Sequence, residues 1–351
     1  MAQAWKCAGL RWSSAEGPAL MWDGARPSPL TWGKRVSFGV VAGGVRQCAG
    51  ARGHPCPVRA AVPGRSTGAR CEECARLDRA HSVAADGIAD DPRPYQVYLA
   101  WFGPGLVKVG ITAAERGPVR LLEQGAICFS WLGVGPLMAA RRTEELLRAA
   151  LRVPDRVPYA VKRAVRSTLP AGEEERAAEL REVYGRAVQL SGWPESLERE
   201  PFQPVDHVRA FGLAGAPAAV GEVSELVPGG SVSGELVAAA GPDLHLATDL
   251  PSTIGFPSTF GPASTLGLPS VTGPAPTFGL PSTLGPASAT GLPSAAGPAS
   301  DVGARSTGRR GVVVLDTRLM RGWRLVPAED GEVSFPVRQF RVAEHRQDGL
   351  F

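Results

Sequence analysis

Four cysteines are the residues in this sequence whose type and spacing most clearly suggest chemistry. Cys71 and Cys74 form a CxxC motif, and two thiolates at this spacing can reach one ion from a tight turn. Cys48 and Cys56 precede the motif and can supply a second pair of ligands. Four thiolates suit tetrahedral zinc, and a closed shell of four protein ligands is typical of a structural site. The spacing therefore predicts a structural zinc site.

Other interpretations of these cysteines stay open. His54 could replace Cys56 as a ligand, or the four thiols could be unconnected. A redox CxxC normally opens a helix after a buried strand, whereas Cys71 follows the turn-rich segment 63–68. In a reducing compartment a cysteine cluster binds metal more often than it forms disulfides, so zinc is the favoured interpretation.

The stretch from Tyr95 to Ala126 predicts a β-hairpin followed by a short helix. A loop at 103–105 pairs Phe102 with Leu106, which places Tyr98 opposite Gly110 and Ala100 opposite Lys108. Tyr98 and Lys108 then share one face, beside a glycine that leaves room for a ligand. The other face is wholly apolar and is expected in the core: Val97, Leu99, Trp101, Val107, Val109 and Ile111.

Glu144 falls on the apolar stripe of a helix predicted over 136–152. The stripe consists of Leu137, Ala140, Leu147 and Leu151. A carboxylate on a buried face needs a cation, a metal or hydrogen-bond donors. On these residues alone, a structural pair with Arg120 or Arg142 is the simplest explanation.

The order and spacing of these residues resemble the core of the GIY-YIG nuclease superfamily. The resemblance covers residues 95 to 155 and rests on Val97-Tyr98, Lys108-Val109-Gly110-Ile111-Thr112, Arg120-Leu121, and Glu144 with Leu147 and Leu151. The same block, with its cysteine-bearing segment, also resembles an uncharacterised bacterial and archaeal domain-of-unknown-function family. That second resemblance covers most of the chain outside the repeats described below.

The nuclease resemblance implies a role for each polar residue. Tyr98 would act as a base or orient the attacking water, Arg120 would stabilise the charged phosphate, and Glu144 would hold one Mg²⁺ or Mn²⁺ ion. A tyrosine, with a pKa near 10, needs a nearby cation to act as a base at neutral pH, and Lys108 lies on its face.

Three residues depart from the nuclease pattern. Gln96 replaces the first glycine, Lys108 replaces the second tyrosine, and Gln124 stands where a histidine or tyrosine often follows the arginine. These changes weaken the implied activity more than the implied fold. Lys108 could contact phosphate directly, which suits either cleavage or binding without turnover.

A basic stretch favours an anionic partner. It is opposed over the same span only by Glu144, Glu145 and Asp155. Next to a nuclease-like hairpin it indicates nucleic acid, with DNA favoured over RNA, although basic runs are often merely solvated and the net charge of +4 is mild. The basic residues are Arg141, Arg142, Arg148, Arg152, Arg156, Lys162, Arg163 and Arg166.

The elements that position these residues predict an α+β fold, with a small antiparallel sheet flanked by helices. Strands are expected at 95–102, 106–112 and 126–132, and helices at 118–124, 136–152 and 173–191. We expect five segments: a β segment at 1–47, the cysteine segment at 48–94, the GIY-YIG-like core with a helical extension at 95–211, a disordered spacer at 212–306, and a β meander at 307–351.

The spacer is predicted from its repeats. Glycines recur every six residues from Gly255 to Gly297, which resembles the hexads of a β-helix. Each hexad also carries a proline, which removes a ladder donor, so a disordered insertion is favoured. The strands after it need a core, and the N-terminal strands are the expected host.

No apolar run reaches the roughly 18 residues of a membrane helix, and the N-terminus lacks an apolar signal core. A cytoplasmic protein without membrane contacts is therefore expected. Three functions fit the residues: a zinc-stabilised metal-dependent endonuclease, a nucleic-acid-binding module without turnover, and a zinc-containing scaffold for partner proteins.

Overall fold

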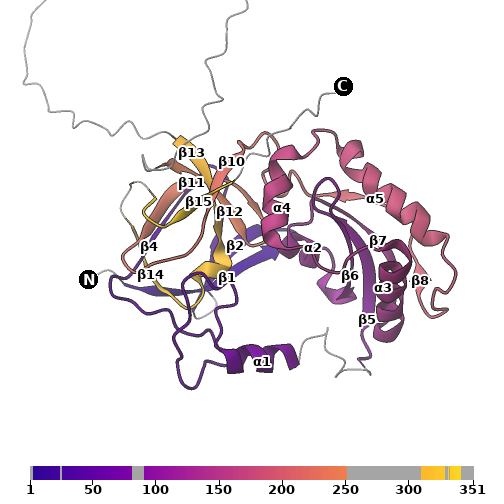
Figure 1. The fold of residues 1–351 in the computed structure, drawn as a ribbon, viewed down its shortest axis with the longest axis horizontal. Coiled ribbons are helices and arrows are strands. Elements are labelled where there is room, and N and C mark those ends of the chain that lie inside the picture. The colour runs from indigo at the N-terminus through magenta and orange to yellow at the C-terminus, as the bar shows by residue number, and fades with distance from the viewer. Residues whose placement is uncertain are drawn as a thin grey trace, which may run out of the picture. The chain divides into compact units, whose positions relative to one another are not determined.

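A ten-stranded sheet joins the N-terminal strands to segments late in the chain (Figure 1). The structure is a computed structural model that describes residues 3–23, 26–80, 91–250, 310–328, 331 and 333–340. Within these ranges the strands lie in the order β15 (Val337–Gln339), β10 (Ala219–Val223), β13 (Arg310–Asp316), β12 (Asp243–Asp249), β11 (Ser231–Ala240), β4 (Arg35–Val40), β14 (Arg324–Val326), β1 (Trp5–Ser13), β2 (Gly17–Trp22) and β3 (Arg26–Pro29). β10 and β13 are parallel, whereas the other neighbours pair antiparallel.

The expected start of the disordered spacer at Gly212 is wrong, because residues 219–249 form β10, β11 and β12. Leu236, Leu244 and Leu246 of these strands are almost completely buried. The many small residues of this stretch resemble a spacer in composition, but they allow close packing. The remainder of the predicted spacer, from residue 251 to 306, lies outside the described residues.

The C-terminal strands do not form a meander. β13 inserts between β10 and β12, β15 pairs with β10, and β14 lies between β1 and β4. β13 and β14 each fill a gap between strands from elsewhere in the chain, whereas β15 extends the sheet at its edge. The N-terminal strands therefore host β14, but the β10–β12 segment hosts β13 and β15.

A second, five-stranded sheet carries the predicted hairpin. Its order is β6 (Val107–Ala113), β5 (Pro94–Trp101), β7 (Cys128–Pro136) and β8 (Glu198–Arg199), and β9 (Val205–Asp206) also pairs with β7. The α+β class is confirmed, but a single small sheet is not: the described chain contains this sheet and the larger one. The helices are α1 (Glu72–Ala80), α2 (Val119–Gln124), α3 (Leu137–Leu151), α4 (Tyr159–Val165) and α5 (Glu173–Val188).

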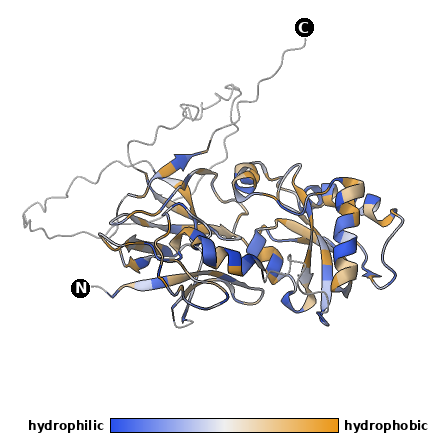
Figure 2. Ribbon diagram, turned by 60° about the horizontal axis from the view of Figure 1, so that its bottom comes forward, coloured by the Kyte–Doolittle hydropathy of each residue, from blue (hydrophilic) through white to orange (hydrophobic). Residues whose placement is uncertain are grey.

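The hairpin register is confirmed. Tyr98 lies opposite Gly110 and Ala100 opposite Lys108, and the backbone N–H of Phe102 donates to the carbonyl of Leu106. Both faces are covered, however, because α3 and α5 contact β5 while Leu121 of α2 packs in a cluster with Tyr98, Ala100 and Phe102. Helices that cover a sheet need one apolar and one polar face. Their ribbons accordingly carry hydrophobic and hydrophilic residues side by side (Figure 2).

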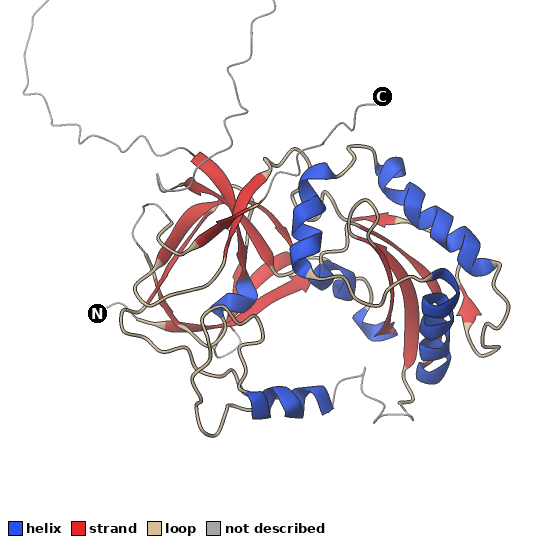
Figure 3. Cartoon of the chain, viewed as in Figure 1, coloured by secondary structure: helices blue, strands red, loops and turns tan. Residues whose placement is uncertain are grey.

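Helix α2 and the segment around it link the two sheets (Figure 3). α2 contacts β1 and β11, and it ends at Gly125, whose φ of 69° is left-handed. A Cβ at Gly125 would lie 3.1 Å from the backbone nitrogen of Gly241, in the turn between β11 and β12. Glycine is therefore required here for both the helix stop and the close approach.

Candidate metal centre and candidate active site

The four predicted cysteines converge. Cys48 and Cys56 lie in the long loop after β4, Cys71 precedes α1, and Cys74 lies in the first turn of α1. Their four Sγ atoms all lie within 4.8 Å of one another. A zinc–sulfur distance of about 2.3 Å gives a tetrahedron with edges of roughly 3.8 Å, so this arrangement is compatible with structural zinc.

Backbone amides support the thiolates. The N–H groups of Gly50 and Cys71 donate to the Sγ of Cys48 at 3.4 and 3.2 Å. Hydrogen bonds, first from the Ala60 N–H, lower the pKa of Cys56 to about 7, whereas burial raises that of Cys74 to about 12. Amide donors stabilise the deprotonated sulfur that a metal requires.

The alternative ligand and the redox interpretation fit less well. His54 is exposed and does not belong to the cluster. Cys74 does lie in the first turn of a helix, as a redox motif would, but two further thiols share its site. A dithiol that exchanges disulfides needs no such third and fourth ligand, so the geometry favours metal.

Arg46 ties the cysteine loop to the C-terminal strands, and sequence reasoning missed it. Its side chain is 1% exposed, and burial lowers its pKa to about 10. The guanidinium donates to five backbone carbonyls, those of Pro63, Gly64, Ser66, Arg318 and Arg321. No sequence pattern distinguishes this arginine, because its acceptors are backbone groups far apart in the chain.

Tyr98, Lys108, Arg120 and Glu144, called here the polar cluster, share one electrostatic neighbourhood. The Lys108 Nζ lies 5.5 Å from the centroid of the Tyr98 ring. The charges of Arg120 and Glu144 act on the pKa of both Tyr98 and Lys108. The structure therefore brings the four residues together from β5, β6, α2 and α3.

Glu144 has the surroundings of an incompletely satisfied carboxylate. It is half-buried, and burial raises its pKa while the charge of Lys108 opposes that rise. Arg120 pairs with Glu123 at 3.6 Å. Over residues 91–250 and the other described ranges, we find no hydrogen bond or ion pair of the Glu144 carboxylate. The expected structural pair of Glu144 with Arg120 or Arg142 is therefore not formed among the described residues.

Tyr98 is less suited to proton transfer than the resemblance implies. It is 1% exposed, and its hydroxyl accepts a hydrogen bond from Gln124 Nε2 at 2.8 Å. Burial raises the pKa of Tyr98, and the effects of Gln124 and Arg120 do not reverse this. Gly110 does not leave room for a ligand either: a Cβ there would lie 2.4 Å from the Tyr98 hydroxyl, so the ring itself fills that space.

The segment after α3 closes one side of the cluster. The Val109 N–H donates to the carbonyl of Pro154 at 3.0 Å, and Lys108 Nζ donates to that of Asp155 at 3.1 Å. The charge of Asp155 also acts on the pKa of Lys108 and of Glu144. Asp155 thus belongs to the site. In the sequence it was visible only as one acidic residue within a basic stretch.

Seven of the eight residues of the basic stretch fall into two groups. Arg142, Arg148, Arg152 and Arg156 are exposed. Lys162 is buried, with its Nζ 3.7 Å from the centroid of the Phe102 ring, and it donates to the carbonyl of Gln124. Three of the eight basic residues therefore do not form a solvated surface, since Arg163 and Arg166 are also turned inward.

Arg163 and Arg166 of the basic stretch meet acids of the large sheet. Arg163 pairs with Glu222 at 2.8 Å, Asp243 at 2.5 Å and Asp316 at 2.6 Å. Arg166 pairs with Asp243 at 2.7 Å. These pairs connect the segment 159–166 to β10, β12 and β13, so their role is to hold the two sheets together.

The chain matches a family of proteins of unknown function. The profile of that family, DUF2797, covers residues 33–256. The chain belongs to this family. All four cysteines and the whole polar cluster lie within the DUF2797 match, whereas β1, β2 and the strands after residue 309 lie outside it. No curated protein and no solved structure matches the chain.

The membership confirms the expected kinship with an uncharacterised family, and it assigns no activity. Among the described residues, no helix is long and apolar enough to span a membrane.

Proposed function

We propose that this protein is a divalent-metal-dependent phosphodiesterase that acts on nucleic acid, preferentially DNA, and is stabilised by structural zinc. The supporting observation is the half-buried carboxylate of Glu144, whose charge acts together with that of Arg120 on Lys108. Two cations and one carboxylate in one electrostatic neighbourhood suit a phosphate diester and a hard metal ion together.

Glu144 would hold Mg²⁺ or Mn²⁺, which supplies charge neutralisation at a phosphate oxygen and activates water. Arg120 is 41% exposed in its side chain and is tied only loosely to Glu123, so it is free to reorient toward a phosphate. Lys108 supplies a second positive charge from β6. The exposed Arg142, Arg148, Arg152 and Arg156 would track the strand beyond the site.

Tyr98 receives a different role in this proposal from the one that the nuclease resemblance implies. Its hydroxyl is engaged by Gln124 and its pKa is raised by burial. Tyr98 is therefore a positioning residue that holds Gln124 and supports Lys108. This same observation favours a second candidate, a nucleic-acid-binding module without turnover, because the proton acceptor that the nuclease resemblance implies is not poised to act.

The test is a cleavage screen with the full chain on single-stranded, duplex, branched and RNA substrates, with Mg²⁺, with Mn²⁺ and with EDTA. Glu144→Gln should abolish metal-dependent cleavage and leave binding within about threefold. Tyr98→Phe should retain cleavage within roughly tenfold, since a general acid or base contributes about 10²–10⁴-fold. Glu145→Gln is the matched control, because Glu145 is exposed on the same helix.

Salt-sensitive binding without cleavage by any metal would establish the second candidate. Neither binding nor cleavage would leave the scaffold as the surviving hypothesis. Loss of cleavage in Glu145→Gln to the same degree as in Glu144→Gln would contradict the assignment of the metal ligand.

A further inference from the structure

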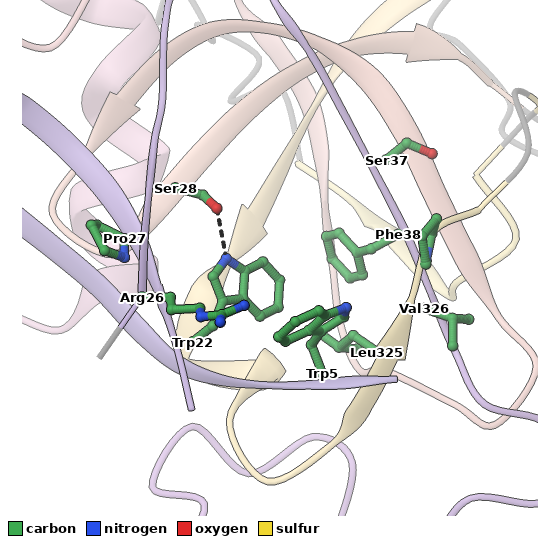
Figure 4. A pocket seen from close by; sticks show the side chains of 10 residues that line it. Trp5, Trp22, Arg26, Pro27, Ser28, Ser37, Phe38, Leu325 and Val326 are labelled. Carbon is green, nitrogen blue, oxygen red and sulfur yellow. Dashed lines mark hydrogen bonds between the residues drawn. The ribbon is translucent and has the colours of Figure 1, made fainter. Parts of the chain in front are cut away.

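A pocket of about 380 Å³ lies in the large sheet, apart from the polar cluster (Figure 4). Five consecutive strands line it, β3, β2, β1, β14 and β4. Register explains the convergence: Trp5 lies opposite Leu325, and Trp22 lies opposite Arg26. The volume falls at the lower end of the range of about 300–1,000 Å³ that is usual for small-molecule sites.

Aromatic rings dominate the lining. Trp5 and Trp22 are only half-buried, whereas Phe38 and Leu325 are buried beneath them. Figure 4 shows the two indoles close together, with Leu325 next to Trp5 and the Phe38 ring beside both indoles. Half-exposed indole faces are costly to leave in water and suit a planar ring that stacks on them.

The charge of the lining is positive. The Arg26 guanidinium lies 5.6 Å from the centroid of the Trp5 ring, and none of the described residues that line the pocket is acidic. Arg26 is exposed, and among the described residues we find no carboxylate paired with it. The Arg26 side of the pocket therefore favours an anionic group of a ligand.

The two hydroxyls at the pocket are already engaged. The Ser28 Oγ accepts a hydrogen bond from Trp22 Nε1 at 2.9 Å, and the Ser37 Oγ donates to the carbonyl of Ala328 at 2.9 Å. Few side-chain groups are left to read the polar edge of a ring. Stacking without edge recognition tolerates different rings, as in single-strand binding.

We propose that this pocket binds one nucleobase, stacked on Trp5 and Trp22, with its phosphate at Arg26 and with little preference among bases. The choice of a nucleotide over other aromatic anions rests on the proposed function. The pocket residues themselves are distinct from the polar cluster, and Trp5, Trp22 and Arg26 precede the segment matched by the family. The base can belong to a free nucleotide or to a single strand, and the test separates these sources.

The test is a calorimetric titration of the full chain with adenosine 5′-monophosphate, adenosine, inorganic phosphate, indole-3-acetate and a twelve-residue single-stranded oligonucleotide. Arg26→Gln should weaken adenosine monophosphate about tenfold and affect adenosine much less, because the phosphate contact is lost while both indoles remain. Trp5→Ala should weaken both ligands at least fivefold, because stacking is lost. Arg11→Gln is the control, since Arg11 is exposed on β1 and does not line the pocket.

Near-ultraviolet circular dichroism checks that Trp5→Ala is folded, and the exposed Arg26 gives a second variant with little risk to folding. Arg26-dependent binding of the monophosphate assigns a free nucleotide. If the oligonucleotide binds through Arg26 and the monophosphate does not, the ligand of the pocket is a base of a single strand.

The proposal is overturned if neither adenosine monophosphate nor the oligonucleotide binds at millimolar concentration. It is also overturned if Arg26→Gln and Trp5→Ala bind these ligands as the parent does. Equal or tighter binding of indole-3-acetate would overturn the nucleotide class. Glu144→Gln should bind the monophosphate normally. If the parent protein cleaves no substrate but binds the monophosphate through Arg26, the proposed function is wrong and the pocket assignment is supported.

Discussion

Lys108 shows how burial changes a residue that the sequence presents as an ordinary basic group. It is 8% exposed, lies near the ring of Tyr98 and donates to the carbonyl of Asp155. Burial and, to a lesser degree, the charge of Arg120 lower its pKa to about 8, because both penalise the ammonium. Lys108 thus changes charge in a pH range where ordinary lysines do not.

The lowered pKa predicts a pH-dependent affinity for nucleic acid. Lys108 is protonated below pH 8 and loses its charge above it, so affinity should fall several-fold between pH 7 and pH 9 at constant ionic strength. Lys108→Arg should remove this dependence, because arginine keeps its charge. Fluorescence anisotropy with a labelled duplex measures the effect.

Lys34→Arg, which changes an exposed lysine outside the polar cluster, should keep the pH dependence of the parent. An unchanged pH profile in Lys108→Arg would show that another group titrates. The lowered pKa also has a cost: below pH 8 the folded protein holds a buried charge. The contribution of Lys108 to stability therefore rises with pH between about 8 and its unfolded value.

At the scale of elements, the cysteine loop and α1 form a unit with little apolar core of its own. The buried side chains of its cluster are Cys48, Cys56, Val62 and Cys74. Thiols occupy most of the positions that aliphatic residues fill elsewhere, so we expect a bound metal, rather than apolar packing, to hold the loop. Arg46 then fastens this loop to the segment 318–321.

Cys71→Ser should therefore lose bound zinc and cost roughly 2 kcal/mol or more of the free energy of unfolding, because metal binding is coupled to folding. Zinc content by elemental analysis and urea denaturation measure the two effects. Cys128→Ala is the control, since Cys128 is buried in β7 outside the cluster. Equal zinc content in parent and Cys71→Ser would refute the site.

At the scale of the whole molecule, one cation holds three acids from separate strands. The side chain of Arg163 is 10% exposed and those of Glu222, Asp243 and Asp316 are at most 6% exposed. Removing one partner of a buried ion pair leaves an uncompensated charge, which is costlier than the pair is stabilising.

Arg163→Met should accordingly lower the free energy of unfolding by about 3–5 kcal/mol. Arg181→Met removes an exposed pair with Glu174 and should cost less than about 1 kcal/mol. Urea denaturation compares them. A small effect of Arg163→Met would mean that Arg166, Arg318 and Arg338 suffice to compensate the acids.

The repeat segment joins two strands that are partners. Asp249 at the end of β12 lies opposite Arg310 at the start of β13, so 251–309 connects the ends of an antiparallel pair. Replacing 251–309 by a short glycine-containing linker should preserve zinc content and stability, or raise stability by about 1–2 kcal/mol, because a shorter loop costs less closure entropy.

Deletion of 212–306 is the comparison variant for the short linker. It removes β10, β11 and β12 and should therefore abolish folding. Circular dichroism and zinc analysis of both variants test this. Unfolding of the short-linker variant would contradict the hairpin interpretation.

The sequence by itself determined the local elements and the ligand set. The hairpin at 95–112, the helices near 118–124, 136–152 and 173–191, and the four cysteines were all predicted, because apolar periodicity, turn residues and motif spacing are local signals. Glu144 was also marked as unusual by its place on an apolar stripe.

Only the tertiary structure decided which polar groups are free. It turned Lys162, Arg163 and Arg166 inward, engaged the Tyr98 hydroxyl with Gln124, and made residues 219–249 the middle of a large sheet. These outcomes depend on partners that lie tens to hundreds of residues away. Charge, composition and periodicity within a short window carry no information about such partners, so burial and pairing emerge only when the strands assemble.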